Sequence, residues 1–148
     1  MKKKILIITL IIVVAIGIAI WATTRKHEKI ENDNLKIVTS FYPIYVMTAN
    51  ITQNVPDVEL VNMTEANVGC LHDYTISTTD MKKIEKADIY IQNGLGLESF
   101  MDKIISAYSE LKIIDSSANI SNKIQDENET NPHIWTSIEN YIKQVETI

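Results

Sequence analysis

Short apolar runs alternate with amphipathic stretches from Lys36 to the end of the chain. Four runs rich in Ile and Val have the length of strands: residues 36–40, 58–61, 87–92 and 112–114. Four stretches carry apolar residues at helical spacing: residues 42–54, 77–86, 97–108 and 137–148. This alternation predicts an α/β domain, with a parallel sheet that has helices on both faces. Such sheets bind ligands in the crevice at the carboxyl ends of their strands.

Local sequence signals mark where the predicted helices begin and end. Pro43 is typical of the first turn of a helix, and Ser77 with Asp80 forms a capping-box pattern. Ser137 is an N-cap for the last helix, which is predicted to run to the final residue. Residues 116–130 are polar and predict a loop. The predicted helix over 97–108 has one apolar face, formed by Leu97, Met101, Ile104, Ile105 and Tyr108.

The amino terminus carries an uncharged apolar run of 18 residues, 5–22, behind three lysines at 2–4. At about 1.5 Å per residue a helix of this length reaches roughly 27 Å, close to the thickness of a bilayer core. The run exceeds the usual core of a secretory signal and is followed by Arg25 and Lys26, which resemble a stop-transfer flank. We therefore expect a membrane helix, with a cleaved signal peptide as the alternative.

These patterns predict three segments: a signal or membrane anchor with its basic flank (1–29), a linker (30–35) and a domain (36–148). We expect the domain at the cell membrane, on the extracellular side. Residues 30–148 hold eight Lys or Arg and eighteen Asp or Glu. A domain this acidic is a poor nucleic-acid binder, because phosphate contacts need clustered cations. The balance is compatible with cation binding.

Two histidines lie where an α/β sheet places its site. His72 falls between the second strand and its helix, and His133 falls just before the last helix. Imidazole is the commonest metal ligand and suits zinc, and Pro132 fixes the backbone ahead of His133. Either histidine could instead be a loop residue that hydrogen-bonds the backbone. Two histidines alone do not make a zinc site, which normally needs three or four protein ligands.

Other polar residues give weaker indications. His27 lies in the basic linker and is interpreted as solvated, while Cys70 is either a small buried residue or a thiolate ligand. Asp73 could orient His72 or form an acid–base pair with it, but no nucleophile is placed for a hydrolase. Residues 93–96 lack the spacing and the lysine of phosphate-binding loops.

Four sequence blocks together resemble a known family. They are Lys36 to Pro43, Gly69 to Met81, Lys86 to Glu98, and Asn131 to Trp135. In this order and at these spacings, residues 36–148 are similar to the N-terminal lobe of zinc/manganese ABC-transporter substrate-binding proteins of the zinc-uptake type. Family members often have proline just before the first ligand histidine, where this chain has Leu71.

The resemblance implies that His72 and His133 are metal ligands in one lobe of a two-lobed protein. The second lobe would supply a third histidine and a carboxylate. It implies Zn²⁺ as cargo, with Mn²⁺ as the alternative, and an ABC permease as partner. We expect a membrane-anchored monomer that catalyses no reaction. The chain stops at Ile148 inside a helical pattern, so we expect it to be part of a longer protein. The alternative is a truncated, membrane-tethered lobe that buffers metal or binds a partner without transport.

Overall fold

A computed structural model describes residues 13–17, 34–65, 68, 71–123, 125–126 and 129–148. The chain divides into two compact units, residues 1–33 and 34–148. The predicted membrane segment at 5–22 lies outside the described residues except for 13–17, which are helical. None of the helices in the described part of the chain is long and apolar enough to cross a membrane.

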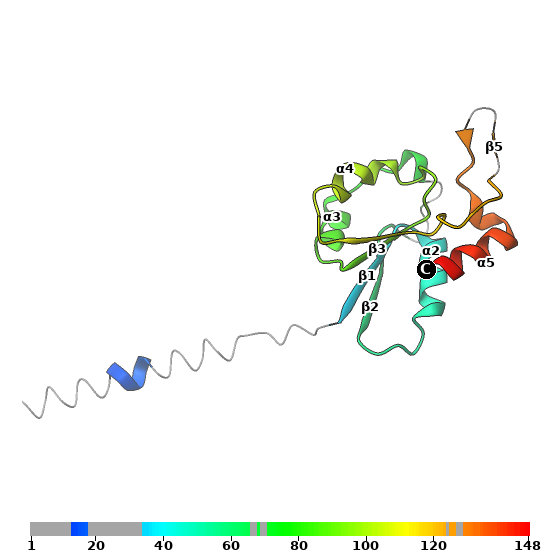
Figure 1. Ribbon diagram of the computed structural model, residues 1–148. Helices are drawn as coiled ribbons and strands as arrows, with labels where there is room; N and C mark the ends of the chain where they lie inside the picture. Colours follow the sequence, from blue (N-terminus) through cyan, green and yellow to red (C-terminus); the bar gives the residue numbers. More distant parts are fainter. Residues whose placement is uncertain (1–12, 18–33, 66–67, 69–70, 124, 127–128) are drawn as a thin grey trace, which may run out of the picture. The chain divides into compact units, whose positions relative to one another are not determined.

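The second unit is built on a sheet of four parallel strands (Figure 1). The strands are β1 (Leu35–Thr39), β2 (Val58–Asn62), β3 (Ile89–Gln92) and β4 (Lys112–Asp115), in the order β2-β1-β3-β4. The register places Ile37 opposite Leu60 on β2 and opposite Ile89 on β3. The prediction of a parallel sheet is confirmed, and each strand begins and ends within two residues of its predicted bounds.

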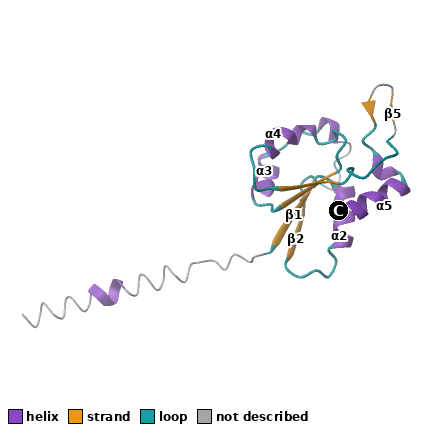
Figure 2. Cartoon of the chain, viewed as in Figure 1, coloured by secondary structure: helices purple, strands orange, loops and turns teal. Residues whose placement is uncertain are grey.

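Helices cover both faces of this sheet (Figure 2). They are α2 (Tyr42–Ile51), α3 (Thr78–Glu85), α4 (Asp102–Ile105) and α5 (Ile138–Thr147). Pro43 lies in the first turn of α2, and Ser77 and Asp80 form the predicted capping box of α3. The Ser137 hydroxyl accepts a hydrogen bond from the Asn140 amide and caps α5, as predicted.

Neighbouring strand residues supply two separate cores, because side chains alternate between the faces of a strand. Ile37 and Ile91 belong to one core, together with Ile44 and Met47 of α2, and the partly buried Val145 of α5 packs against it. The other core holds the neighbours of those strand residues, Val38 and Tyr90, with Ile84 of α3 and Met101. Both faces of the sheet are therefore buried, as a parallel sheet requires.

The predicted continuous helix over 97–108 is wrong. The segment is a 3-10 turn (Ser99–Met101) followed by the single α-helical turn α4. Gly94, Leu95 and Gly96 have positive φ, so the chain turns sharply before the helix begins. Leu97 consequently packs into the core beside α2, whereas Met101 packs into the opposite core. A Cβ on Gly94 would overlap Asp115 Oδ1 and Ser117 Oγ, so the two turns after β3 and β4 are in close contact.

The polar stretch 116–130, predicted as a loop, contains a short antiparallel hairpin. Its strands are β5 (Gln125–Asp126) and β6 (Glu129–Thr130). Two further 3-10 turns, Leu71–Asp73 and Ile134–Thr136, complete the second unit. Each of these turns adjoins or contains one of the two candidate histidines.

Candidate metal centre

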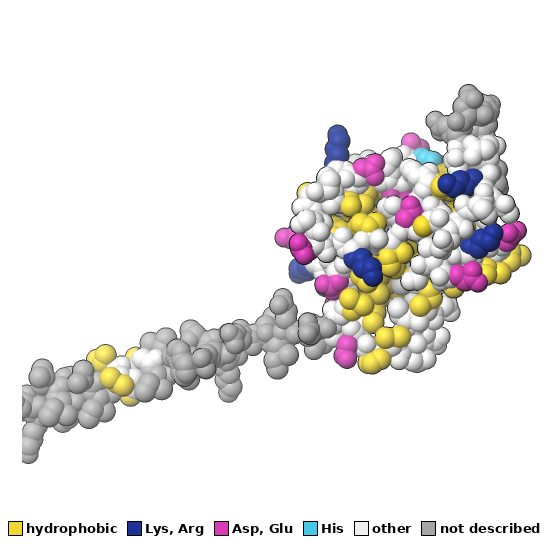
Figure 3. Space-filling model, viewed as in Figure 1, with side chains coloured by type: hydrophobic (Ala, Val, Ile, Leu, Met, Phe, Trp, Pro, Cys, Tyr) yellow, Lys and Arg dark blue, Asp and Glu magenta, His cyan; other side chains and the backbone are white. Residues whose placement is uncertain are grey.

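The structure brings His72 and His133 together at the carboxyl end of the sheet. His72 lies in the 3-10 turn that connects β2 to α3, and His133 directly precedes the turn that leads into α5. Their ring centroids are 5.6 Å apart, with 57° between the ring planes. Although 61 residues separate the two histidines in sequence, the fold places both imidazoles on one side of this edge. Histidine is exposed at the end of the domain from which the β5–β6 hairpin projects (Figure 3).

The turn that carries His72 is anchored by its neighbour Leu71. The Leu71 side chain is fully buried in the core beside α2, while His72 and Asp73 are exposed. The Tyr74 amide donates a hydrogen bond to the Leu71 carbonyl oxygen and closes the turn. Leu71 therefore fixes the backbone of the turn, and the His72 side chain points out from it.

Tyr74 ties the same turn to the start of α3. Its hydroxyl donates to Asp80 Oδ2 at 2.8 Å, the same oxygen that accepts from the Ser77 amide and hydroxyl. Burial disfavours a charged Asp80, but the hydrogen bonds from Ser77 and Tyr74 and the nearby Lys83 outweigh it and lower the pKa of Asp80. Burial and the Asp80 carboxylate raise the pKa of Tyr74 to about 12. The phenol thus stays protonated and keeps donating.

Asn131 orients the imidazole of His133. Its Oδ1 lies 2.8 Å from His133 Nδ1 and 2.9 Å from the His133 backbone nitrogen. Because an amide oxygen only accepts hydrogen bonds, Nδ1 carries the proton in the neutral ring, which leaves the lone pair on Nε2. Metal-binding histidines are commonly held in this way through the other ring nitrogen. Sequence reasoning missed Asn131, although an Asn two residues ahead of a backbone amide is the pattern of an Asx turn.

Two aromatic rings link His133 to the core. The Trp135 ring centroid is 5.1 Å from that of His133 and 4.8 Å from that of the buried Phe41, which it meets edge-on. Phe41 follows β1, so this contact links the His133 segment to the centre of the sheet. A ring packed between histidine and core restricts where the imidazole can move.

Next to the peptide that joins Pro132 to His133 lies a group of buried polar side chains, which we call the polar floor: Asn93, Glu98, Ser116 and Gln144. Glu98 accepts hydrogen bonds from the Asn93 and Gly94 backbone amides at 2.8 and 3.1 Å. Burial raises the pKa of Glu98, and these amides together with Ser40 partly offset the increase. The Glu98 side chain thereby holds closed the turn that follows β3.

The spacing of the two imidazoles is compatible with one shared metal ion. Two rings bound to a tetrahedral zinc at Zn–N distances of about 2.0–2.1 Å have centroids roughly 5 Å apart. The observed separation is 5.6 Å. Among the described residues, no group of three or more His, Cys, Asp or Glu could hold a metal ion. Cys70, the alternative thiolate ligand, lies outside the described residues.

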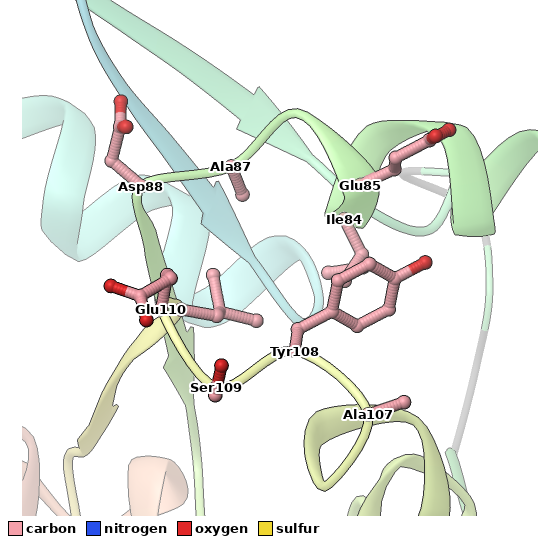
Figure 4. Close-up of a pocket in the computed structure, with 9 residues that line it drawn as sticks. Ile84, Glu85, Ala87, Asp88, Ala107, Tyr108, Ser109 and Glu110 are labelled. Carbon is pink, nitrogen blue, oxygen red and sulfur yellow. The ribbon is translucent and has the colours of Figure 1, made fainter.

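A cavity of about 400 Å³ lies at the other end of the sheet (Figure 4). Ala87 and Asp88 precede β3 and Leu111 precedes β4, so the cavity adjoins the amino ends of these strands. Its lining includes the apolar side chains of Ile84 and Tyr108 together with Glu85, Asp88 and Glu110, and the carboxylates of Glu85 and Asp88 point away from it. His72 follows the carboxyl end of β2, and the Pro132 carbonyl beside His133 contacts Asn93 at the carboxyl end of β3, so this cavity is not part of the same site.

The parallel sheet with helices on both faces is the α/β fold of substrate-binding proteins. The chain belongs to the family of the zinc-uptake complex component A, periplasmic, whose sequence model matches residues 37–148.

Individual relatives agree with this assignment. The zinc-binding protein AdcA of Streptococcus pyogenes serotype M3 is 30% identical over 113 residues, covering 76% of this chain and 21% of AdcA. The manganese-binding lipoprotein MntA of Halalkalibacterium halodurans is 27% identical over 148 residues, covering 99% of this chain and 48% of MntA.

The fold also matches a solved structure. A manganese-bound periplasmic metal-binding protein from Candidatus Liberibacter asiaticus superposes with a TM-score of 0.66 at 32% identity. The match covers 76% of this chain and 42% of that protein. The chain thus spans less than half the length of each of these three proteins.

Proposed function

We propose that this chain captures a divalent metal ion, zinc or manganese, as the binding component of an ABC transporter and delivers it to a membrane permease. The observation that carries the proposal is the pair of imidazoles, His72 and His133, with ring centroids 5.6 Å apart at the carboxyl end of the sheet. Relatives named for zinc and manganese binding support the choice of metal. The metal is cargo, and no chemical step is assigned to the chain.

His72 and His133 are the proposed ligands, and Asn131 holds His133 in the form that presents Nε2. Neutral imidazoles favour zinc, whereas oxygen ligands favour manganese, so the other ligands decide the metal. In this proposal they come from water, from Cys70 or from a second lobe with a histidine and a carboxylate. Because imidazole binds metal only when neutral, affinity falls as protons compete for it at lower pH.

The proposal places the domain outside the cytoplasm, tethered by the apolar run at 5–22. The name of MntA as a lipoprotein supports a membrane tether, although the run here is the anchor we propose. A tethered lobe holds its cargo close to the permease, which raises the effective concentration for transfer.

Zinc titration against a competing chelator tests the proposal. The full 148-residue chain is solubilised in mild detergent at neutral pH and compared with His72→Ala, His133→Ala and His27→Ala. We expect each of the first two substitutions to weaken zinc binding at least about tenfold, since each removes a ligand. His27→Ala is the matched control and is expected to bind as the parent chain does. If all three variants bind zinc equally, His72 and His133 are not the ligands and the proposal fails.

A further inference from the structure

The polar floor connects three elements next to the His133 segment. Asn93 follows β3, Ser116 follows β4, and Gln144 lies on α5. Asn93, Ser116 and Gln144 are fully buried, and Glu98 is 3% exposed. Side chains this polar are expensive to bury unless their hydrogen bonds are used. The partners of these side chains therefore indicate what the cluster does.

Asn93 is the member of the polar floor that contacts the His133 segment. Its Nδ2 donates to the Pro132 carbonyl oxygen at 2.9 Å and to the Gly94 carbonyl oxygen at 3.0 Å. The Pro132 carbonyl belongs to the same planar peptide unit as the His133 nitrogen. A hydrogen bond to that oxygen therefore fixes the plane from which the His133 side chain departs.

The Asn93 amide is itself held in one orientation. Gln144 Nε2 donates to Asn93 Oδ1 at 3.1 Å and to Ser116 Oγ at 2.8 Å. Ser116 Oγ in turn donates to the Asn93 carbonyl oxygen at 3.2 Å. Because Gln144 supplies a donor to Oδ1, the Nδ2 group must face Pro132. The backbone of Asn93 is fixed separately, by the carboxylate of Glu98.

We propose that Asn93, oriented by Gln144, is a positioning residue for metal capture: it holds the Pro132 carbonyl and thereby sets the direction of the His133 imidazole toward the metal. Asn93 does not touch the metal. This inference rests on the proposed function, in which His133 is a ligand. Asn131 fixes the rotation of the ring, and Asn93 fixes the backbone that carries it.

The test is the substitution Asn93→Asp in the full chain in detergent. This change keeps an acceptor for Gln144 and replaces the donor to Pro132 with an oxygen. Loss of a group that orients a metal ligand costs about 10–100-fold in affinity, so we expect the zinc dissociation constant to rise by at least about tenfold. Thr48→Val is the matched control, since it removes the buried hydrogen bond from Thr48 Oγ1 to the Ile44 carbonyl on α2.

A second readout needs no metal. The imidazole ¹⁵N and ¹H resonances of the metal-free chain are assigned with the three histidine-to-alanine variants. Asn93→Asp is expected to shift the His133 resonances and to leave those of His72 in place, whereas Thr48→Val moves neither. If the parent chain binds no zinc, the proposed function fails, and the His133 resonances still test the positioning role.

Two outcomes would overturn the inference. One is a folded Asn93→Asp chain that binds zinc within about twofold of the parent, as a surface substitution would, and shows unmoved His133 resonances. If Asn93→Asp does not fold, the variant Gln144→Met takes its place in both measurements. Methionine is close in size to glutamine and removes the amide that orients Asn93. Unchanged affinity and unchanged His133 resonances in Gln144→Met are the second such outcome, and a shift in both supports the proposal.

Discussion

The two histidine segments are built in different ways. His72 is exposed on a one-turn 3-10 helix, and its support is the buried side chain of Leu71 beneath the backbone. His133 is half-buried, and its ring contacts both Asn131 and Trp135. At His72 the fold fixes the backbone and leaves the side chain exposed, whereas at His133 it also orients the ring.

The difference shows how one site can combine a pre-oriented ligand with an exposed one. A ligand that is already oriented loses little freedom on binding, which favours affinity. An exposed ligand can reach a metal in solution and can swing away again. In the proposed function, His133 is the ligand that the fold orients in advance, and His72 is the exposed ligand that orients on binding.

The substitution with the largest expected effect removes the support of the turn that carries His72. Leu71→Ala removes a fully buried side chain, and such truncations cost about 2–5 kcal/mol. We expect the free energy of unfolding, measured with urea, to fall by that amount. Ile51→Ala on the exposed side of α2 is the control, with an expected change of about 0.5 kcal/mol or less. Equal losses in both variants would show that Leu71 does not anchor the turn.

The substitution with the next largest expected effect removes the group that orients the His133 ring. Asn131→Ala removes the acceptor for His133 Nδ1 and frees the ring to change tautomer. We expect zinc affinity, measured by chelator competition, to fall about 10–100-fold. Asp73→Ala beside His72 is the counterpart, and we expect it to change zinc affinity by roughly twofold or less, as surface substitutions do. A larger loss in Asp73→Ala than in Asn131→Ala would reverse the assignment of the oriented ligand.

The smallest effect concerns the link from the His72 turn to α3. Asp80→Asn weakens the hydrogen bonds from Ser77 and Tyr74 and is expected to cost about 1 kcal/mol of stability near neutral pH. The folded pKa of Asp80 lies below its ordinary value of 3.8, so its contribution is present above that value and is lost as pH falls through the folded pKa. Urea unfolding should therefore show a difference between the two chains at neutral pH that shrinks below pH 3.8. A difference independent of pH would contradict this origin.

Much of the fold could be predicted because its signals are local. The apolar runs of the four strands, Pro43, the capping box at Ser77 and the N-cap Ser137 all act within a few residues of themselves. The continuous helix predicted after β3 is wrong, although apolar residues do recur there at helical spacing. A hydrogen-bonded turn outside that periodic stretch sets the backbone conformation. Glu98 reaches back to the amides of Asn93 and Gly94, and periodicity carries no information about that contact.

The candidate site was predictable in part, for the same reason. The sequence identifies His72 by its place between a strand and a helix and His133 by its place before the last helix, and the resemblance to a family selects them as ligands. Neither the role of Asn131 nor the contact between Asn93 and Pro132 could be predicted, because each depends on how side chains meet in the folded chain. The second contact joins residues 39 positions apart.

Gly94 shows how little freedom this edge of the sheet leaves. The turns that follow β3 and β4 meet at this residue, where φ is +88° and the space that a Cβ would fill is already taken by Asp115 and Ser117. A substitution would have to displace the side chains of Asp115 and Ser117, whose mutual hydrogen bonds hold the second turn, and would place an L side chain at a strained φ. We therefore expect a saturation library at position 94 to be strongly enriched in glycine.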